Sequence, residues 1–462
     1  MLIAPVTWEG ARGGELPSPF QRGKQERPLR ITLHTSTFAA LAPPEWDAAD
    51  ALRELAGEPD IVTVATEPGP LPQLHVGPFD PTADHVPVSV RYPDGRTSHT
   101  GVWFPAQWPR LAAQLAGQSD PHHPDAQAAL GDLLVAQAHA AARQDILVTG
   151  SPWLLGPTGR ELMGRVNPLR PSDAAKLSGL FLRSRERYLL LPGLPTGRWL
   201  LYWALARAAL PSMRRYFGAC VPAGDARGDD TASLGGSVLL RFARALQARD
   251  AIGVQCYVPQ THDAQDAAMY HFDYLSLLLV GALDAQARVA HRAYGLPARA
   301  ERNASFNKPA WRDQLLRQGA VPLHRLATDP ASLAVLSLLF TLRHLIHGAA
   351  LHAVTSGSDA RSASTLVELP NDEAQQLWDA AEGQGSAARW GMTQSATETM
   401  FSPYPYASAL VEECLRLIDA IAAETDVARL FPLGHVVPPL TDAPSEDVAF
   451  SEPARRWLSF LG

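Results

Sequence analysis

The sequence predicts an α+β protein in which an α/β domain is followed by a mostly α-helical domain. Its 462 residues exceed the size at which one hydrophobic core stops growing, so two domains are expected. The chain is 46% hydrophobic and 19% charged, which excludes a disordered protein. Strand and helix signals alternate up to about residue 165, and helical periodicity dominates beyond it. We therefore expect a flexible segment over residues 1–28, an α/β domain over 29–165 and a helical domain over 166–462.

The α/β domain is predicted from short runs that alternate between two periodicities. Runs with alternating or continuous apolar residues indicate strands, and Ala-rich and Leu-rich runs with three- and four-residue spacing indicate helices. A Pro-Asp-Gly turn signal at residues 93–95 indicates a hairpin. We expect strands at residues 29–33, 60–65 and 145–149, and helices at 46–55 and 124–143.

The second domain is expected to be almost entirely helical, because its apolar residues recur every three or four positions and β-branched alternation is scarce. The expected helical segments are residues 173–187, 196–220, 234–251, 264–294, 311–318, 329–354 and 408–428. Two stretches, 222–231 and 356–364, are poor in apolar residues and rich in turn formers. They are expected to be linkers.

The net charge of −7 conceals an uneven distribution along the chain. It divides into −6 for residues 1–165, +9 for residues 166–355 and −10 for residues 356–462. Arg241, Arg244 and Arg249 lie in the basic part and could line a surface that binds RNA. Alternatively, these arginines pair with the acidic segments within one molecule. The sequence is consistent with both an RNA-binding surface and ion pairing within one molecule.

Cysteine and apolar patterns indicate the cellular setting. The three cysteines are far apart and form no CxxC pair, so neither a disulfide scaffold nor a zinc site is expected. The longest apolar runs, residues 333–342 and 274–283, are about half the roughly 20 residues that a membrane-spanning helix needs. The N-terminus lacks the apolar core of a signal peptide. We expect a cytoplasmic protein with no membrane partner, no cofactor and no bound metal.

Polar residues in the first domain stand at strand ends and on a helix. His34-Thr35-Ser36 follows the first strand, Asp132 stands near the start of a helical run, and Thr149-Gly150-Ser151 ends a later strand. This order, over about residues 29–160, resembles the PIN family of nucleases. In that family aspartates stand at the positions of His34 and Ser151, which implies a metal-dependent nuclease fold. Magnesium needs several hard oxygen ligands. We therefore expect a PIN-like domain that has lost its metal site, with Asp132 serving as a helix N-cap or first-turn acid.

The densest group of chemically active residues is Arg343, His344 and His347. On a helix Arg343 and His347 share one face, and His344 lies beside them. A histidine can exchange a proton with a ribose 2′-hydroxyl while a guanidinium stabilises the pentacoordinate phosphate, so this group could cleave RNA without a metal ion. The apolar helix that leads into it resembles the HEPN superfamily, over about residues 264–355. Three residues separate Arg343 from His347, whereas the family usually has four to six.

Asp284, Arg288 and His291 form a second polar stripe at i, i+4 and i+7 of one predicted helix. The stripe could face Arg343 and His347 across the bundle, with Asp284 orienting a basic partner. It could also be the solvated side of an amphipathic helix, or a buried ion pair, and these structural interpretations are favoured.

Two functions follow from these patterns. In the first, the protein binds RNA through its basic middle and cleaves it with Arg343 and His347, as a toxin- or defence-type endoribonuclease. The HEPN resemblance then implies a homodimer formed through the helical domain. In the second, it is a non-catalytic interaction or regulatory scaffold built from degenerate nuclease folds, as the replaced carboxylates at His34 and Ser151 suggest.

Overall fold

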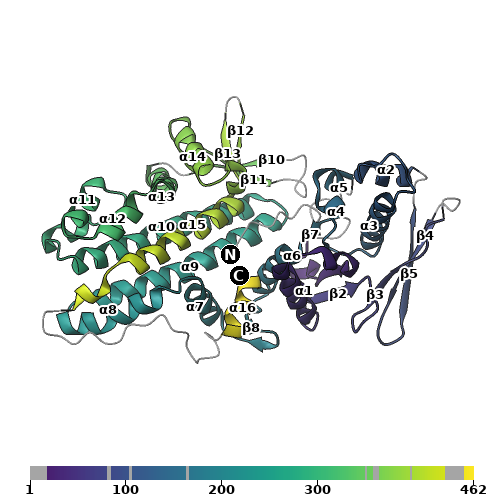
Figure 1. Cartoon of the computed structure of the whole chain (residues 1–462), viewed down its shortest axis with the longest axis horizontal. Coiled ribbons are helices and arrows are strands. Elements are labelled where there is room, and N and C mark those ends of the chain that lie inside the picture. The colour runs from purple at the N-terminus through teal and green to yellow at the C-terminus, as the bar shows by residue number, and fades with distance from the viewer. Residues whose placement is uncertain are drawn as a thin grey trace. The chain divides into compact units, whose positions relative to one another are not determined.

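The chain is an α+β protein made of two compact units, shown in the computed structural model of Figure 1. The structure describes residues 18–80, 85–103, 107–162, 166–348, 351–356, 364–395, 398–431 and 452–461. The units divide between Arg185 and Glu186 rather than near residue 165. The division lies there because strand Pro168–Leu169 (β7) extends the sheet of the first unit, and helix Pro171–Ser184 (α6) packs against helix Pro43–Leu55 (α1).

The first unit is built on a mixed seven-stranded sheet with the order β5-β4-β3-β2-β1-β6-β7. Parallel pairing joins β1 to β2 on one side and to β6 on the other, and β4 and β5 form the expected antiparallel hairpin. Besides β7, the strands of this sheet are β1 (Leu29–Leu33), β2 (Ile61–Ala65), β3 (Gln73–Val76), β4 (His85–Arg91), β5 (Thr97–Trp103) and β6 (Ile146–Val148). The three strands predicted for this unit are confirmed.

Helices cover this sheet and complete the hydrophobic core. The helix predicted at residues 124–143 is α3, and its alanines and leucines pack with valines of β4 and β5. Small side chains let the helix approach the sheet closely. The other helices of the unit are α2 (Trp108–Leu115), α4 (Pro152–Leu155), α5 (Pro157–Leu162) and the short turns η1 (Gly23–Gln25) and η2 (Thr35–Ala40).

The second unit is organised around two long helices, α9 (Thr231–Tyr257) and α10 (His262–Ala293), which run side by side, with α15 (Pro403–Glu424) packed on both (Figure 1). The surrounding helices are α7 (Arg198–Ala209), α8 (Met213–Arg227), α11 (Pro309–Arg317), α12 (Val321–Thr328), α13 (Pro330–Gly348), α14 (Asn371–Gly383) and α16 (Glu452–Leu461), with η3 (Ala298–Asn303), η4 (Ala387–Trp390) and η5 (Val427–Leu430).

The second unit is less completely helical than the sequence suggested. It contains a four-stranded antiparallel sheet with the order β10-β11-β13-β12, and a two-stranded sheet formed by β8 and β9. These strands contain two to five residues and lie between longer segments with helical spacing, so they were not predicted. They are β8 (Leu189–Leu191), β9 (Leu194–Pro195), β10 (Ala353–Ser356), β11 (Ser364–Glu368), β12 (Met392–Gln394) and β13 (Thr399–Phe401).

Three predicted segments of this unit were wrong. The helix expected at residues 329–354 is α13, which ends at Gly348, and residues 353 and 354 begin strand β10. Residues 196–220 form two helices rather than one, because the chain breaks at Leu210 and Pro211 before α8 begins. The expected linker at 222–231 is largely helical: α8 continues through Pro222 to Arg227 and ends at Gly228, which has φ of +64°. The middle of the other expected linker, residues 357–363, lies outside the described residues.

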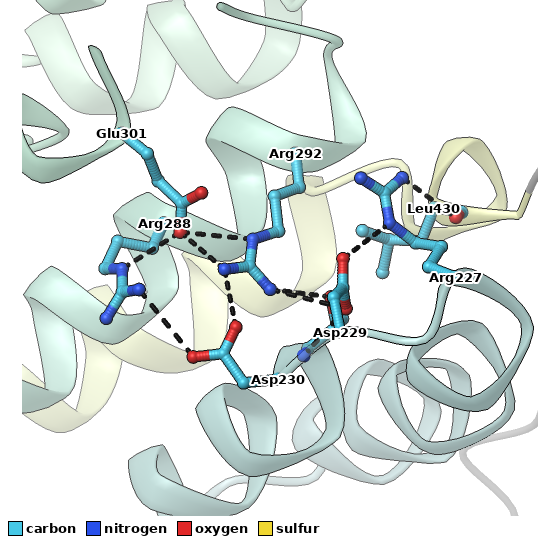
Figure 2. A network of polar contacts seen from close by, with 8 residues as sticks. Arg227, Asp229, Asp230, Arg288, Arg292, Glu301 and Leu430 are labelled. Carbon is cyan, nitrogen blue, oxygen red and sulfur yellow. Dashed lines mark hydrogen bonds and ion pairs between the residues drawn. The ribbon is translucent and has the colours of Figure 1, made fainter. Parts of the chain in front are cut away.

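An ion-pair network links the start of α9 to the end of α10 (Figure 2). Arg292, whose side chain is 10% exposed, lies 2.6 Å from both Asp230 and Glu301 and 3.4 Å from Asp229. Arg288 lies 3.0 Å from Glu301 at the outer side of the network. Because Arg292 is the more buried of the two arginines, the network depends on it most.

Candidate functional site

The first candidate site lies where the strand order of the sheet in the α/β unit reverses, between β1 and β6. From β1 the chain reaches β2 on one side, whereas β6 pairs on the other side, so the loops after β1 and β6 diverge from one another. Such a switch point at the carboxyl ends of parallel strands is where open α/β sheets bind ligands. His34 directly follows β1, and Ser151 follows β6 after two residues.

The structure brings the three residues predicted here, His34, Asp132 and Ser151, into one cluster. His34 Nε2 lies 3.5 Å from Asp132 Oδ1, and His34 Nδ1 lies 3.2 Å from Thr149 Oγ1. The Ser151 side chain donates a hydrogen bond to the Asp132 carboxylate. Asp132 is not a helix cap or first-turn acid as expected, because α3 already begins at Pro124 and places Asp132 in its interior, facing His34.

Burial controls the ionisation of this cluster. Asp132 is 8% exposed, and removal from water raises its pKa to about 6, although the hydrogen bond from Ser151 opposes that rise. His34 is 3% exposed, and burial lowers its pKa to about 4. At neutral pH a neutral imidazole therefore lies beside a carboxylate.

The magnesium ion that the PIN resemblance implies does not fit this cluster. Asp132 supplies its one carboxylate, and that group is already engaged with Ser151 and His34. Hard divalent ions bind through several oxygen ligands. Within the described part of the chain, no group of three His, Cys, Asp or Glu side chains could hold a metal ion.

Sequence reasoning missed a second buried pair on the same helix face. His139 lies seven residues after Asp132 on α3, and its Nδ1 is 3.0 Å from Oγ1 of Thr32 on β1. Burial lowers the pKa of His139 to about 3. The sequence did carry a signal for this pair. Asp132 and His139 are seven residues apart, which places them on one face of α3, and Thr32 and His34 are two residues apart, which places them on one face of the β1 strand.

The second candidate site is an open groove in the helical unit. Arg343, His344 and His347 of α13 all line it, together with Glu373 and Gln376 of α14, and its volume is about 710 Å³. All three α13 side chains are exposed. Their helical spacing therefore places them on one accessible surface rather than in the core.

Positive charge gathers beside this groove around Asp284 of α10. Burial raises the pKa of Asp284, and the charges of Arg343, Arg241 and Lys308 oppose that rise. Three cations from three different segments therefore lie within electrostatic reach of one half-buried carboxyl group. Such an excess of positive charge favours an anionic ligand.

The other predicted RNA-binding arginines of α9 differ in accessibility. Arg244 is exposed. Arg249 is only 1% exposed and lies 2.6 Å from Asp250, whose carboxylate also accepts a hydrogen bond from the Tyr202 hydroxyl at 2.9 Å. Arg249 therefore does not belong to a binding surface. It lies about half a turn around the helix from Arg244 and faces the core.

The stripe Asp284, Arg288 and His291 divides between two environments. Asp284 lies near Arg343, whereas Arg288 pairs with Glu301 in the network of Figure 2. His291 is buried, with Nε2 3.0 Å from the Pro297 carbonyl oxygen and Nδ1 accepting a hydrogen bond from Trp311 Nε1 at 3.2 Å. The structural interpretation thus holds for Arg288 and His291.

One helix of the described residues, α13, is by length and composition alone apolar enough to cross a membrane. Its Val335, Leu338 and Leu342 are buried against neighbouring elements, whereas Arg343 and His347 are exposed at its end.

No family model, curated protein or solved structure matches this chain. The fold and the two sites therefore define its class: an α+β protein with a buried His–Asp cluster in one unit and a basic groove in the other.

Proposed function

We propose that the chain is a cytoplasmic RNA-binding protein whose helical unit cleaves RNA without a metal ion, in the manner of HEPN ribonucleases of toxins or defence systems. The observation that carries the proposal is that Arg343, His344 and His347 line one open groove. These are the three residues for which the sequence suggests this chemistry. Arg241 and Lys308 add positive charge beside the groove through their proximity to Asp284.

The proposed reaction is an internal transesterification. One imidazole, assigned to His347, accepts the proton of a ribose 2′-hydroxyl, and the 2′-oxygen attacks the adjacent phosphorus. Arg343 stabilises the negative charge of the pentacoordinate phosphate. The bond from phosphorus to the 5′-oxygen breaks, and that oxygen takes a proton from His344. The products are a 2′,3′-cyclic phosphate and a free 5′-hydroxyl, so DNA, which lacks the 2′-hydroxyl, is not a substrate.

Cleavage of labelled RNA by the full-length protein, with and without EDTA, tests this proposal. Replacing a general base costs about 10²–10⁴ in rate, and removing a group that stabilises transition-state charge costs about 10²–10³, so we expect losses of these sizes in His347→Ala and Arg343→Ala, in that order. Arg317→Ala removes an exposed arginine that does not line the groove, and it serves as the control. Cleavage that EDTA abolishes, or that both groove variants retain, contradicts the proposal.

The alternative is a non-catalytic interaction or regulatory scaffold. It is favoured by the closed His34–Asp132 cluster, where serine and histidine replace the carboxylates of an active PIN-type site. This function predicts RNA binding or partner binding without cleavage at any protein concentration. A homodimer formed through the helical unit is proposed in either case, and light scattering of the purified chain measures it.

A further inference from the structure

One face of α10 carries exposed aromatic and aliphatic side chains that a core helix would bury. Tyr270 is 67% exposed, Tyr274 is 38% exposed and Leu277 is 41% exposed. Positions 270, 274 and 277 are spaced by four and three residues, so they share one side of the helix. The same spacing continues through Gly281 to Asp284, which lies beside Arg343. The apolar stripe therefore leads along one helix face to the basic groove.

The charged side chains near this face of α10 are basic at one end of the face and acidic at the other. At the Asp284 end Arg241 lies across Gly281, and Arg343 and Lys308 are within electrostatic reach of Asp284. At the other end the face is flanked by Asp266 and Asp273. A polyanion would thus contact the groove end through its phosphates, whereas binding at the tyrosine end would depend on contacts with uncharged groups.

We propose that this face of α10 is a path for single-stranded RNA, on which bases stack against Tyr270 and Tyr274 and a phosphate contacts Arg241 before the strand enters the groove. This inference rests on the proposed function of that groove. From Tyr270 to Asp284 the helix rises about 21 Å, at 1.5 Å per residue, enough for several nucleotides. Stacking needs unpaired bases, because the bases of an A-form duplex are already stacked on one another.

A second copy of the chain is the other candidate occupant of this face. Stable interfaces bury about 800 Å² per partner, whereas one aromatic side chain buries about 150–250 Å² at most. Tyr270, Tyr274 and Leu277 are only partly exposed, so together they offer less than a stable dimer requires. The cations beside Asp284 also offer contacts to the phosphates of an anionic strand.

Fluorescence anisotropy of the full-length chain with a labelled single-stranded oligonucleotide tests the path. His347→Ala is present throughout to prevent turnover, so binding is measured independently of cleavage. We expect Tyr270→Ala with Tyr274→Ala to raise Kd about tenfold or more, because stacking on one aromatic ring is worth about 1–3 kcal/mol per base. Replacing both tyrosines by phenylalanine keeps the rings and should leave Kd nearly unchanged. A duplex of the same length should bind weakly and equally to all variants.

Three results would overturn the path. The first is a double alanine variant that is folded by circular dichroism and binds the single strand as tightly as its parent. The second is equal loss in the alanine and phenylalanine variants. The third is a parent dimer that becomes monomeric in the double alanine variant, which would make this face an interface between copies. If the wild-type chain binds RNA through these tyrosines but never cleaves it, the path stands and the proposed ribonuclease fails.

Discussion

Arg241 of α9 lies directly across Gly281 of α10. A methyl group on Gly281 would lie 1.7 Å from Nη1 and 2.7 Å from Cζ of Arg241, so the guanidinium occupies the space that any larger residue would fill. Arg241 is also within electrostatic reach of Asp284, three residues further along α10. The glycine therefore fixes where a cation stands beside the groove.

We expect Gly281→Ala to displace Arg241 without unfolding the protein. The clashing atoms belong to the flexible end of a side chain, and alanine raises helix propensity by up to about 1 kcal/mol. RNA affinity should fall, and the slope of log Kd against log salt concentration should decrease by about 0.7, the value for one lost contact with a single-strand phosphate. Anisotropy titrations at several salt concentrations measure this slope.

Arg241→Ala is the matched comparison for that experiment, because it removes the same cation directly and leaves Gly281 in place. Both variants should show the same change in slope. An unchanged slope in Gly281→Ala together with a reduced slope in Arg241→Ala would mean that Arg241 reaches the phosphate from another position.

The His34–Asp132 pair predicts opposite pH dependences in two variants. Burial holds the pKa of His34 at about 4 rather than 6.5, so its contribution to stability is lost as pH falls from about 6.5 to 4. Burial raises the pKa of Asp132 from 3.8 to about 6, so its contribution is lost as pH rises from about 4 to 6. In the wild type the slope of Asp132 opposes that of His34, and His139, whose pKa burial lowers to about 3, adds a slope of the same sign as that of His34.

Relative to the wild type, Asp132→Asn should therefore lose more stability as pH falls through this range, and His34→Gln should lose more as pH rises, by up to about 3 kcal/mol each. The full-length chain is unfolded in urea at several pH values, and each sample is then given a short deuterium pulse at one fixed pH. Deuterium uptake by the backbone amides of β1 and β6 measures the unfolding of the α/β unit separately from that of the helical unit. Parallel curves for the two variants would show that His34 and Asp132 are not the groups that titrate.

Sequence patterns identified the parts of the fold whose residues carry a repeated signal. α3 and β1 were predicted from the spacing of their apolar residues and β6 from a continuous apolar run, and the order of these elements brought His34, Asp132 and Ser151 together. Strands β8 to β13 were missed because they lie between longer segments with helical spacing. Periodicity also cannot tell which side of a helix faces the core.

That ambiguity explains the errors and omissions in the predicted sites. Arg249 was predicted to lie on an RNA-binding surface, but it is buried beside Asp250. Tyr270 and Tyr274 stood in an apolar pattern typical of a core helix, although both are exposed. Deciding such cases requires knowing which neighbouring helix covers each face, which depends on long-range packing.

Gly235 sets the distance between α8 and α9. A methyl group there would lie 2.8 Å from Cβ and 2.9 Å from Sγ of Cys220, in a buried contact. We expect Gly235→Ala to destabilise the helical unit by about 1–3 kcal/mol, as overpacked cores do. Gly218→Ala, on α8 with no atom within 4 Å of the added methyl, should be neutral or slightly stabilising. Urea unfolding of both variants measures the difference, and equal midpoints would contradict the close packing.

The two arginines of Figure 2 should differ sharply in their importance. Arg292 has a side chain 10% exposed and pairs with Asp229, Asp230 and Glu301, so Arg292→Met removes the cation that all three carboxylates share and should cost about 1.5–3 kcal/mol. Arg288, 40% exposed, pairs with the same Glu301, and Arg288→Met should cost less than about 1 kcal/mol because solvent screens its charge.

Acid should weaken this network in the wild type. The pKa of Glu301 and that of Asp229 are both lowered, against the opposing effect of burial, by hydrogen bonds and by the charge of Arg292. Their contribution is present above the ordinary carboxyl range near pH 4 and is lost as pH falls through their lower folded values. Arg292→Met should therefore unfold with a smaller dependence on pH in acid than Arg288→Met. Equal unfolding midpoints and equal acid dependence in the two variants would show that the network does not hold α9 to α10, because only Arg292 reaches all three carboxylates.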